Sequence, residues 1–207
     1  MNADQVAALR TLLAPTGWLD RTRLFGRALR GWARTPEGLL VLGTPEDEPW
    51  HMTAHLAQEA RLAGVPELEP VLVRWAPPAG APPHLRVGLD RLAAAGRGET
   101  LLIVSPESAP EGLLERVDDV RRAGATILAL DRGDRELTAL AHESLAVPRA
   151  TAPLSFDAAQ HLVTAAAGES RPGRGRPARA ASAGSSLRSR LAQLLNTVSG
   201  PPPGSAD

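Results

Sequence analysis

Three groups of side chains in this sequence of 207 residues could do chemistry, and the first contains two histidines and a glutamate. His51, His55 and Glu59 are spaced four residues apart, so on a helix they would share one face. Imidazole nitrogens and carboxylate oxygens bind zinc in proteins, and the spacing therefore permits a metal site. The pattern is not HExxH, because Met52 stands where that motif has its catalytic glutamate. We favour a solvated helix face, and we predict neither a metal nor a cofactor.

The second group follows two apolar segments, residues 38–42 and 100–105, which have the character of buried strands. Open α/β sheets bind ligands at the carboxyl ends of their strands, so polar residues at these points are candidate ligand contacts. They are Gly43, Thr44, Ser105, Glu107 and Ser108. The acidic residues 46–48 could act as acid or base, but they equally suit the first turn of a helix, which we favour. Ser108 and Glu111 likewise fit a capping box, and we favour a cap over a ligand contact.

The third group lies in the C-terminal part of the chain, residues 168–207. Gly, Pro, Ala, Ser and Arg dominate its first half, and such a composition predicts a disordered tail. Within it, residues 187–198 predict a short amphipathic helix whose apolar face consists of Leu187, Leu191, Leu194, Leu195 and Val198. We expect this segment to fold on a protein partner, because it is too short to be stable alone. The nearby arginines could instead contact nucleic acid or an anionic membrane, which we do not favour, since no aromatic side chain interleaves with them.

The elements that must position these groups alternate regularly along residues 1–167. Uninterrupted apolar runs are typical of buried parallel strands, and amphipathic segments supply the right-handed crossovers. The expected strands are 38–42, 70–75, 100–105, 125–131 and 144–148, and the expected helices are most of 2–35, 49–63, 85–95, about 109–123, 135–142 and a last helix after an N-cap at Ser155. The pattern predicts a three-layer α/β/α sandwich with a parallel sheet of the Rossmann or flavodoxin-like type. His161, on the last helix, is a lone histidine that we interpret as structural.

The composition excludes several classes of function. The sequence has no Cys, and all 23 of its basic residues are Arg, which excludes thiolate chemistry, a Schiff-base lysine and a P-loop lysine. The 23 acidic residues bring the net charge to zero, so the whole chain is not an obvious nucleic-acid or membrane binder. We expect a cytoplasmic protein, because neither a signal-peptide pattern nor a membrane-spanning apolar stretch is evident.

Three segments resemble parts of sugar isomerase (SIS) domains. LLIVSPESAPEGLLERVDDVRRAGATILALDRGDRELTALAHESLAVP (101–148) is similar to their central part, where a strand enters a Ser-x-Ser-Gly-x-Thr loop. GLLVLGTPEDEPWHMTAHLAQEARLAG (38–64) is similar to their first strand, glycine turn and helix, and LSFDAAQHLVTAAAG (154–168) to their C-terminal helix. The resemblance covers roughly residues 20–167. It implies an SIS-like sheet, binding of a carbohydrate derivative such as a phosphosugar, and a homodimer formed in part by the last helix.

The loop after residue 104 departs from the SIS pattern. Ser105 takes the place of the first serine, but Pro106 and Pro110 lack the backbone N–H groups that a phosphate cradle needs. Glu107 adds a negative charge, and two unit charges about 4 Å apart repel by roughly 4 kcal/mol at an effective dielectric of 20. That energy corresponds to about three orders of magnitude in affinity. We therefore expect a pseudoenzyme.

The sequence as a whole predicts a non-catalytic SIS-like binding or scaffold module that engages a protein partner through its tail. Two alternatives stay open. One is a sensor or isomerase for a sugar phosphate or nucleotide-sugar with a rearranged loop. The other is a nucleoid- or membrane-associated protein that acts through the basic tail.

Overall fold

A five-stranded parallel sheet organises the computed structural model, which describes residues 13, 17–152 and 154–169. Its strand order is β2-β1-β3-β4-β5. The strands are β1 (Leu39–Leu42), β2 (Pro70–Val73), β3 (Thr100–Ser105), β4 (Thr126–Asp131) and β5 (Glu143–Ala146). All five lie where the apolar runs predicted them, within about two residues. The two edge strands, β2 and β5, are the least buried of the five.

Both faces of the sheet are covered, which explains why the strands are apolar throughout rather than alternating. All four residues of β1 and all six of β3 are buried. Side chains that alternate along the strands, such as Leu40, Leu101 and Ile103, pack on Leu113 and Val117 of one helical layer. The intervening side chains face the opposite layer.

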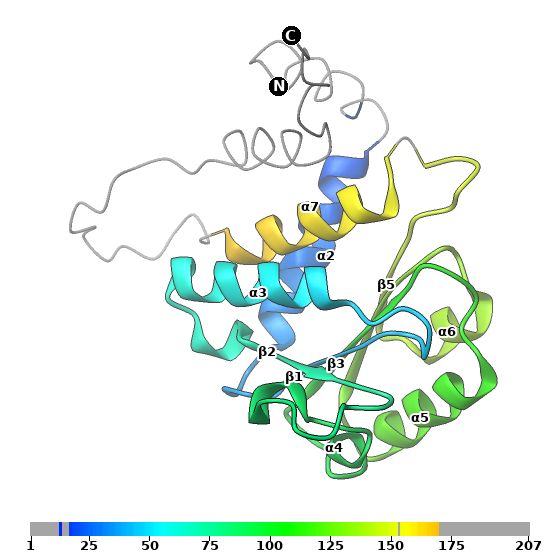
Figure 1. Ribbon diagram of the computed structural model, residues 1–207. Helices are drawn as coiled ribbons and strands as arrows, with labels where there is room; N and C mark the ends of the chain where they lie inside the picture. Colours follow the sequence, from blue (N-terminus) through cyan, green and yellow to red (C-terminus); the bar gives the residue numbers. More distant parts are fainter. Residues whose placement is uncertain (1–12, 14–16, 153, 170–207) are drawn as a thin grey trace, which may run out of the picture. The chain divides into compact units, whose positions relative to one another are not determined.

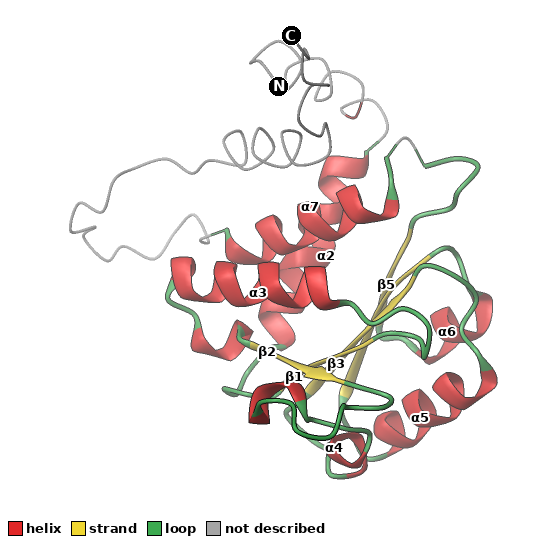
Figure 2. Cartoon of the chain, viewed as in Figure 1, coloured by secondary structure: helices red, strands yellow, loops and turns green. Residues whose placement is uncertain are grey.

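The helices form the two outer layers, as Figures 1 and 2 show. One layer contains α4 (Asp90–Ala93), α5 (Glu111–Arg122) and α6 (Arg135–Leu140). The other contains α2 (Trp18–Trp32), α3 (Trp50–Ala63) and α7 (Phe156–Gly168). The predicted α/β/α sandwich is confirmed for residues 21–169, which form one compact unit. Among the described residues, no helix has both the length and the apolar character of a membrane span.

Helix capping matches the sequence at one predicted position and differs at another. Ser155 caps α7 as predicted, and its Oγ accepts the backbone N–H of Ala158 at 3.1 Å. The predicted capping box at Ser108 is wrong, because α5 begins at Glu111 with Pro110 in the N-cap position and no side-chain cap. Proline suits the start of a helix, because its fixed φ, −69° at Pro110, matches the backbone there.

The helix predicted for residues 85–95 is much shorter than expected. Only Asp90–Ala93 is α-helical, and a 3₁₀ turn, η3 (Pro83–Leu85), precedes it. Between the two, the chain runs beside the end of β2, where the backbone N–H of Arg74 donates to the carbonyl of Val87 at 2.9 Å and Gly88 forms a parallel bridge with Arg74. This pairing replaces the first turn of the helix.

The predicted tail helix with its apolar face, the disorder of the tail and the part of the predicted N-terminal helix before residue 17, except residue 13, lie outside the described residues. Binding of a partner by the tail and the homodimer therefore remain predictions.

Candidate functional site

A cavity of about 240 Å³ opens at the carboxyl edge of the sheet, between the loop after β1, the loop after β3 and the start of α7. This is the edge at which the sequence placed a ligand site. The cavity is lined by Asp47, Glu48, Pro49, His51, Val104, Pro106, Arg132, Ser155, Phe156, Asp157 and Gln160. None of the five predicted ligand contacts is among these lining residues.

The predicted contacts Gly43 and Thr44 shape the first loop instead. A Cβ on Gly43 would lie 2.0 Å from the carbonyl oxygen of Asp47, so only glycine fits at this position. Thr44 is buried, and its Oγ1 accepts the backbone N–H of Asp47 at 3.1 Å. The loop therefore folds back on itself, and it directs the side chains of Asp47 and Glu48 to the cavity.

The hydroxyl of Ser105, the predicted first phosphate contact, is already used within its own loop. Ser105 is fully buried at the end of β3, and its Oγ donates to the carbonyl of Glu107 at 2.8 Å. Glu107 is exposed and paired with Arg149. Solvent and this arginine screen its charge, so Glu107 repels an anion less than the sequence suggested. Ser108 is exposed and lies outside the cavity wall.

Other carboxylates dominate the electrostatics of the cavity. Burial raises the pKa of Asp47 above its usual value, and the negative charges of Asp157 and Glu107 raise it further. Glu48 is paired with Arg74 at 2.8 Å, with both side chains 14% exposed. The guanidinium of Arg74 also lies 4.5 Å from the ring centroid of Trp50, which holds the pair against the first turn of α3.

Arg132 is the one arginine among the residues that line the cavity. Its guanidinium lies 4.8 Å from the ring centroid of Phe156 and donates to the carbonyls of Pro106, at 3.3 Å, and Val147, at 3.1 Å. These contacts fasten the loop after β3 to the end of β5. Two of the five N–H donors of Arg132 are thus used by backbone carbonyls, so Arg132 helps to fix the positions of these two segments.

Asp131, the last residue of β4, is fully buried beneath these loops. Its Oδ1 accepts the backbone N–H groups of Gly133 and, at 3.0 Å, Asp134, while Oδ2 is buried without a hydrogen-bond partner. Burial raises the pKa of Asp131, and the charge of Asp134 acts in the same direction, against the lowering effect of the two N–H groups.

The histidine face of α3 is not solvated in the way the sequence suggested, because it packs against α7. His51 is exposed, but His55 is half-buried and Glu59 is 9% exposed. The third histidine is His161 of α7, which is 6% exposed. His51, His55 and His161 form what we call the histidine cluster. Burial and, to a lesser extent, the neighbouring His55 and His51 together lower the pKa of His161 to about 4.

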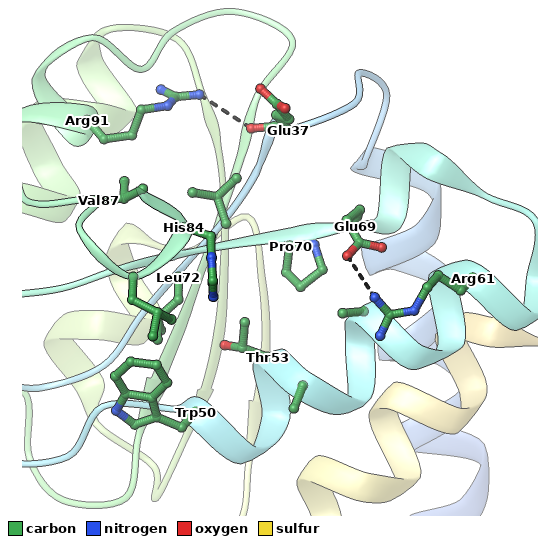
Figure 3. Close-up of a pocket in the computed structure, with 14 residues that line it drawn as sticks. Glu37, Trp50, Thr53, Arg61, Glu69, Pro70, Leu72, His84, Val87 and Arg91 are labelled. Atoms are coloured by element: carbon green, nitrogen blue, oxygen red, sulfur yellow. Dashed lines mark hydrogen bonds and ion pairs between the residues drawn. The ribbon is translucent and has the colours of Figure 1, made fainter. Parts of the chain in front are cut away.

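A second cavity, of about 830 Å³, lies beside the edge strand β2 and is shown in Figure 3. Trp50, Leu72 and Val87 contribute apolar wall. Polar groups of this wall pair with one another: Arg61 lies 3.6 Å from Glu69, and Arg91 donates to the carbonyl of Glu37 at 3.5 Å. Because open α/β sheets bind ligands at the carboxyl ends of their strands, we place the candidate site at the carboxyl edge of the sheet.

Comparisons with known proteins agree with this architecture. No family model matches the sequence, and no curated protein matches it. A solved structure from Silicibacter pomeroyi DSS-3, described as a "putative phosphosugar isomerase", is similar at a TM-score of 0.51 and 17% sequence identity. The match covers 95% of this chain and 54% of that chain, so this chain spans about half the length of its neighbour. At this identity the likeness concerns the fold, which is SIS-like.

Sequence reasoning missed the residues that line the cavity from α7 and from the end of β4, namely Arg132, Phe156 and Asp157. Asp157 lies two residues after the N-cap Ser155, and the position of Arg132 directly after a buried strand was a usable signal. Parallel strands place all such positions on one edge of the sheet.

Proposed function

We propose that this chain is a small-molecule binding module on an SIS-like fold, without isomerase chemistry, and that its sheet-edge cavity takes a neutral or cationic ligand rather than a sugar phosphate. The observation that carries the proposal is the acidic lining, in which the negative charge of Asp157 lies close enough to raise the pKa of Asp47. These carboxylates would repel a phosphate that enters the cavity. The repulsion is roughly 4 kcal/mol for each pair of unit charges about 4 Å apart at a dielectric of 20.

The loop after β3 supports the same proposal. Ser105 donates its hydroxyl proton to the backbone, and Pro106 and Pro110 have no N–H to offer a phosphate. Carboxylates, by contrast, accept hydrogen bonds from hydroxyl and ammonium groups. A volume of about 240 Å³ is below the range of roughly 300–1,000 Å³ that drug-sized ligands occupy. The cavity therefore suits a molecule about the size of a monosaccharide or a short polyamine.

Calorimetric titration with glucose, glucosamine and glucose 6-phosphate tests the proposal, because the three differ in one charged group. We expect glucosamine to bind most tightly and glucose 6-phosphate not to bind measurably. Asp157→Asn should weaken glucosamine binding about tenfold, the effect of 1.4 kcal/mol. The matched control is Asp118→Asn on α5, whose carboxylate pairs with Arg122 in the opposite helical layer.

Two results would contradict the proposal. One is micromolar binding of glucose 6-phosphate. The other is aldose–ketose turnover of a sugar phosphate that is abolished by Ser105→Ala, since an active enzyme of this fold would need that hydroxyl for its ligand.

A further inference from the structure

The histidine cluster brings three ring nitrogens to one point between α3 and α7. The Nε2 atom of His51 lies 2.9 Å from Nε2 of His161 and 3.2 Å from Nε2 of His55. The ligand atoms of the three residues all lie within 4.8 Å of one another. The rings meet edge to face, with centroids 4.4–4.6 Å apart and interplanar angles of 69–88°. They therefore surround a common point and do not stack.

Hydrogen bonds among the rings cannot satisfy this arrangement. In a neutral imidazole, Nε2 carries either one proton or one lone pair, so it makes one good hydrogen bond at that atom. Nε2 of His51 faces two other Nε2 atoms at hydrogen-bond distance. Whichever tautomer His51 adopts, its one proton or one lone pair at Nε2 can point at only one of the two neighbours, so at most one of the two contacts is a well-directed hydrogen bond. Three lone pairs can all be satisfied together only by a group that accepts each of them.

A transition-metal ion is such a group. Zinc binds imidazole nitrogen at about 2.0–2.1 Å, and tetrahedral angles then place two ligand nitrogens about 3.3 Å apart. The distances of 2.9 and 3.2 Å in the cluster come close to this value. We infer that His51, His55 and His161 form a site for a divalent transition-metal ion, with zinc as the best fit.

The local structure makes this a built site and not a chance meeting of surface side chains. His51 and His55 lie four residues apart on one face of α3, and His161 is buried on α7, which packs closely on that face. His51 is exposed, so an ion can reach the cluster from solvent. His51 also lines the acidic cavity, and a metal held by three histidines has a free fourth position. Water or the hydroxyl of a small molecule could fill that position.

The chemistry of the donors selects the class of ion. Imidazole suits zinc, copper and nickel, whereas magnesium and calcium prefer oxygen ligands. The inference stands on the geometry of the cluster, and it does not depend on which small molecule the cavity takes.

The test is calorimetric titration of the full chain with zinc chloride, on protein that carries no histidine tag and has been stripped with a chelator. We expect one zinc ion per chain, no response to magnesium, and a rise in Tm of roughly 5–10 °C at a free zinc concentration of about 100 times Kd. Cobalt(II) should bind in its place and give the visible absorption bands of a four-coordinate ion. His51→Ala and His55→Ala remove exposed and half-buried ligands, so both variants should fold.

Each of these two variants should lose more zinc affinity than the about 10–100-fold that removal of an outer-shell partner costs. His84→Ala is the matched control, since His84 is exposed on η3, outside the cluster, and its loss should leave zinc binding unchanged. Absence of zinc binding by the parent protein would overturn the inference. Unchanged zinc affinity in His55→Ala would also overturn it. A third contradicting result is a loss of zinc affinity in Asp157→Asn but not in the histidine variants, because it would place the ion in the acidic cavity.

Discussion

Replacement of Gly26 by alanine tests the packing of α7 against α2. This packing matters because α7 forms one side of the sheet-edge cavity and one side of the histidine cluster. A Cβ at this position would lie 2.7 Å from Cβ of Ala166, 2.8 Å from the backbone nitrogen of Ala167 and 2.9 Å from the carbonyl oxygen of Val163. Carbon atoms prefer separations of about 3.5–4.0 Å, so α7 must move by close to 1 Å. Two of the three contacts are to backbone atoms, and no change of rotamer can relieve them.

The magnitude follows from two opposing effects. Overpacking of a core typically costs about 1–3 kcal/mol, and here the upper half of that range applies, because a whole helix must shift. Alanine in place of glycine inside a helix returns up to about 1 kcal/mol. We therefore expect Gly26→Ala to lower the free energy of unfolding by about 1–2 kcal/mol. For a chain of this size, that is a decrease in Tm of roughly 2–8 °C.

Gly31→Ala is the matched control in the same helix, because a Cβ there meets nothing within 4 Å. Alanine at position 31 favours the helix more than glycine does and causes no clash, so the Tm of this variant should rise by up to about 4 °C. Thermal and urea denaturation followed by circular dichroism measure both variants, and equal urea m-values show that the unfolded states are comparable. If Gly26→Ala is as stable as Gly31→Ala, α2 and α7 do not pack at this distance and the reasoning is refuted.

Two further predictions concern aspartates at the carboxyl edge. Asp134→Ala should lower the free energy of unfolding by about 1–2 kcal/mol, measured by urea denaturation. The reason is that the Asp134 carboxylate caps α6, where it accepts the backbone N–H groups of Glu136 and Leu137, and also accepts the N–H of Ala109 at 2.8 Å. Asp134→Asn keeps one acceptor oxygen and should lower the free energy of unfolding less, so equal losses in the two variants would argue against the cap. Asp131→Asn should change how the stability of the protein depends on pH. Because the pKa of Asp131 is raised in the folded protein, the native state keeps a proton that the unfolded chain releases above about pH 4. The parent protein therefore loses stability as the pH rises from 4 through the folded pKa. Urea denaturation between pH 4 and 7 should show the stability of the variant relative to the parent increasing with pH, and a constant difference would mean that Asp131 is ionised in the native state at pH 4.

Local sequence predicted the elements well where one physical requirement dominated. The runs at 100–105 and 126–131 can only be buried strands of a covered sheet, because they are short, apolar throughout and bounded by polar turns. Ser155 was recognised as an N-cap because its hydroxyl serves the next turn of the same helix. Ser108 has the same residue type and failed as a cap, since the prolines around it set where α5 begins.

The candidate site was harder to predict, because the residues with suitable chemistry have other partners in the fold. Thr44 and Ser105 have hydroxyl groups in the right places, but backbone groups two or three residues away use both of them. Such local hydrogen bonds compete with ligands, and sequence spacing does not reveal which one prevails. The acidic character of the cavity depends on Asp47 and Asp157, which are 110 positions apart in the chain.

The sequence alone determined the α/β class of this protein and the order of its elements, because these depend on the burial of short apolar runs and on the direction of parallel strands. It also determined that His51 and His55 share a helix face. Only the tertiary structure decided that His161, which sequence reasoning treated as a lone structural residue, meets them. The physical reason is that the contact depends on how α3 and α7 are rotated and spaced when they pack, and side chains along the whole interface set that geometry.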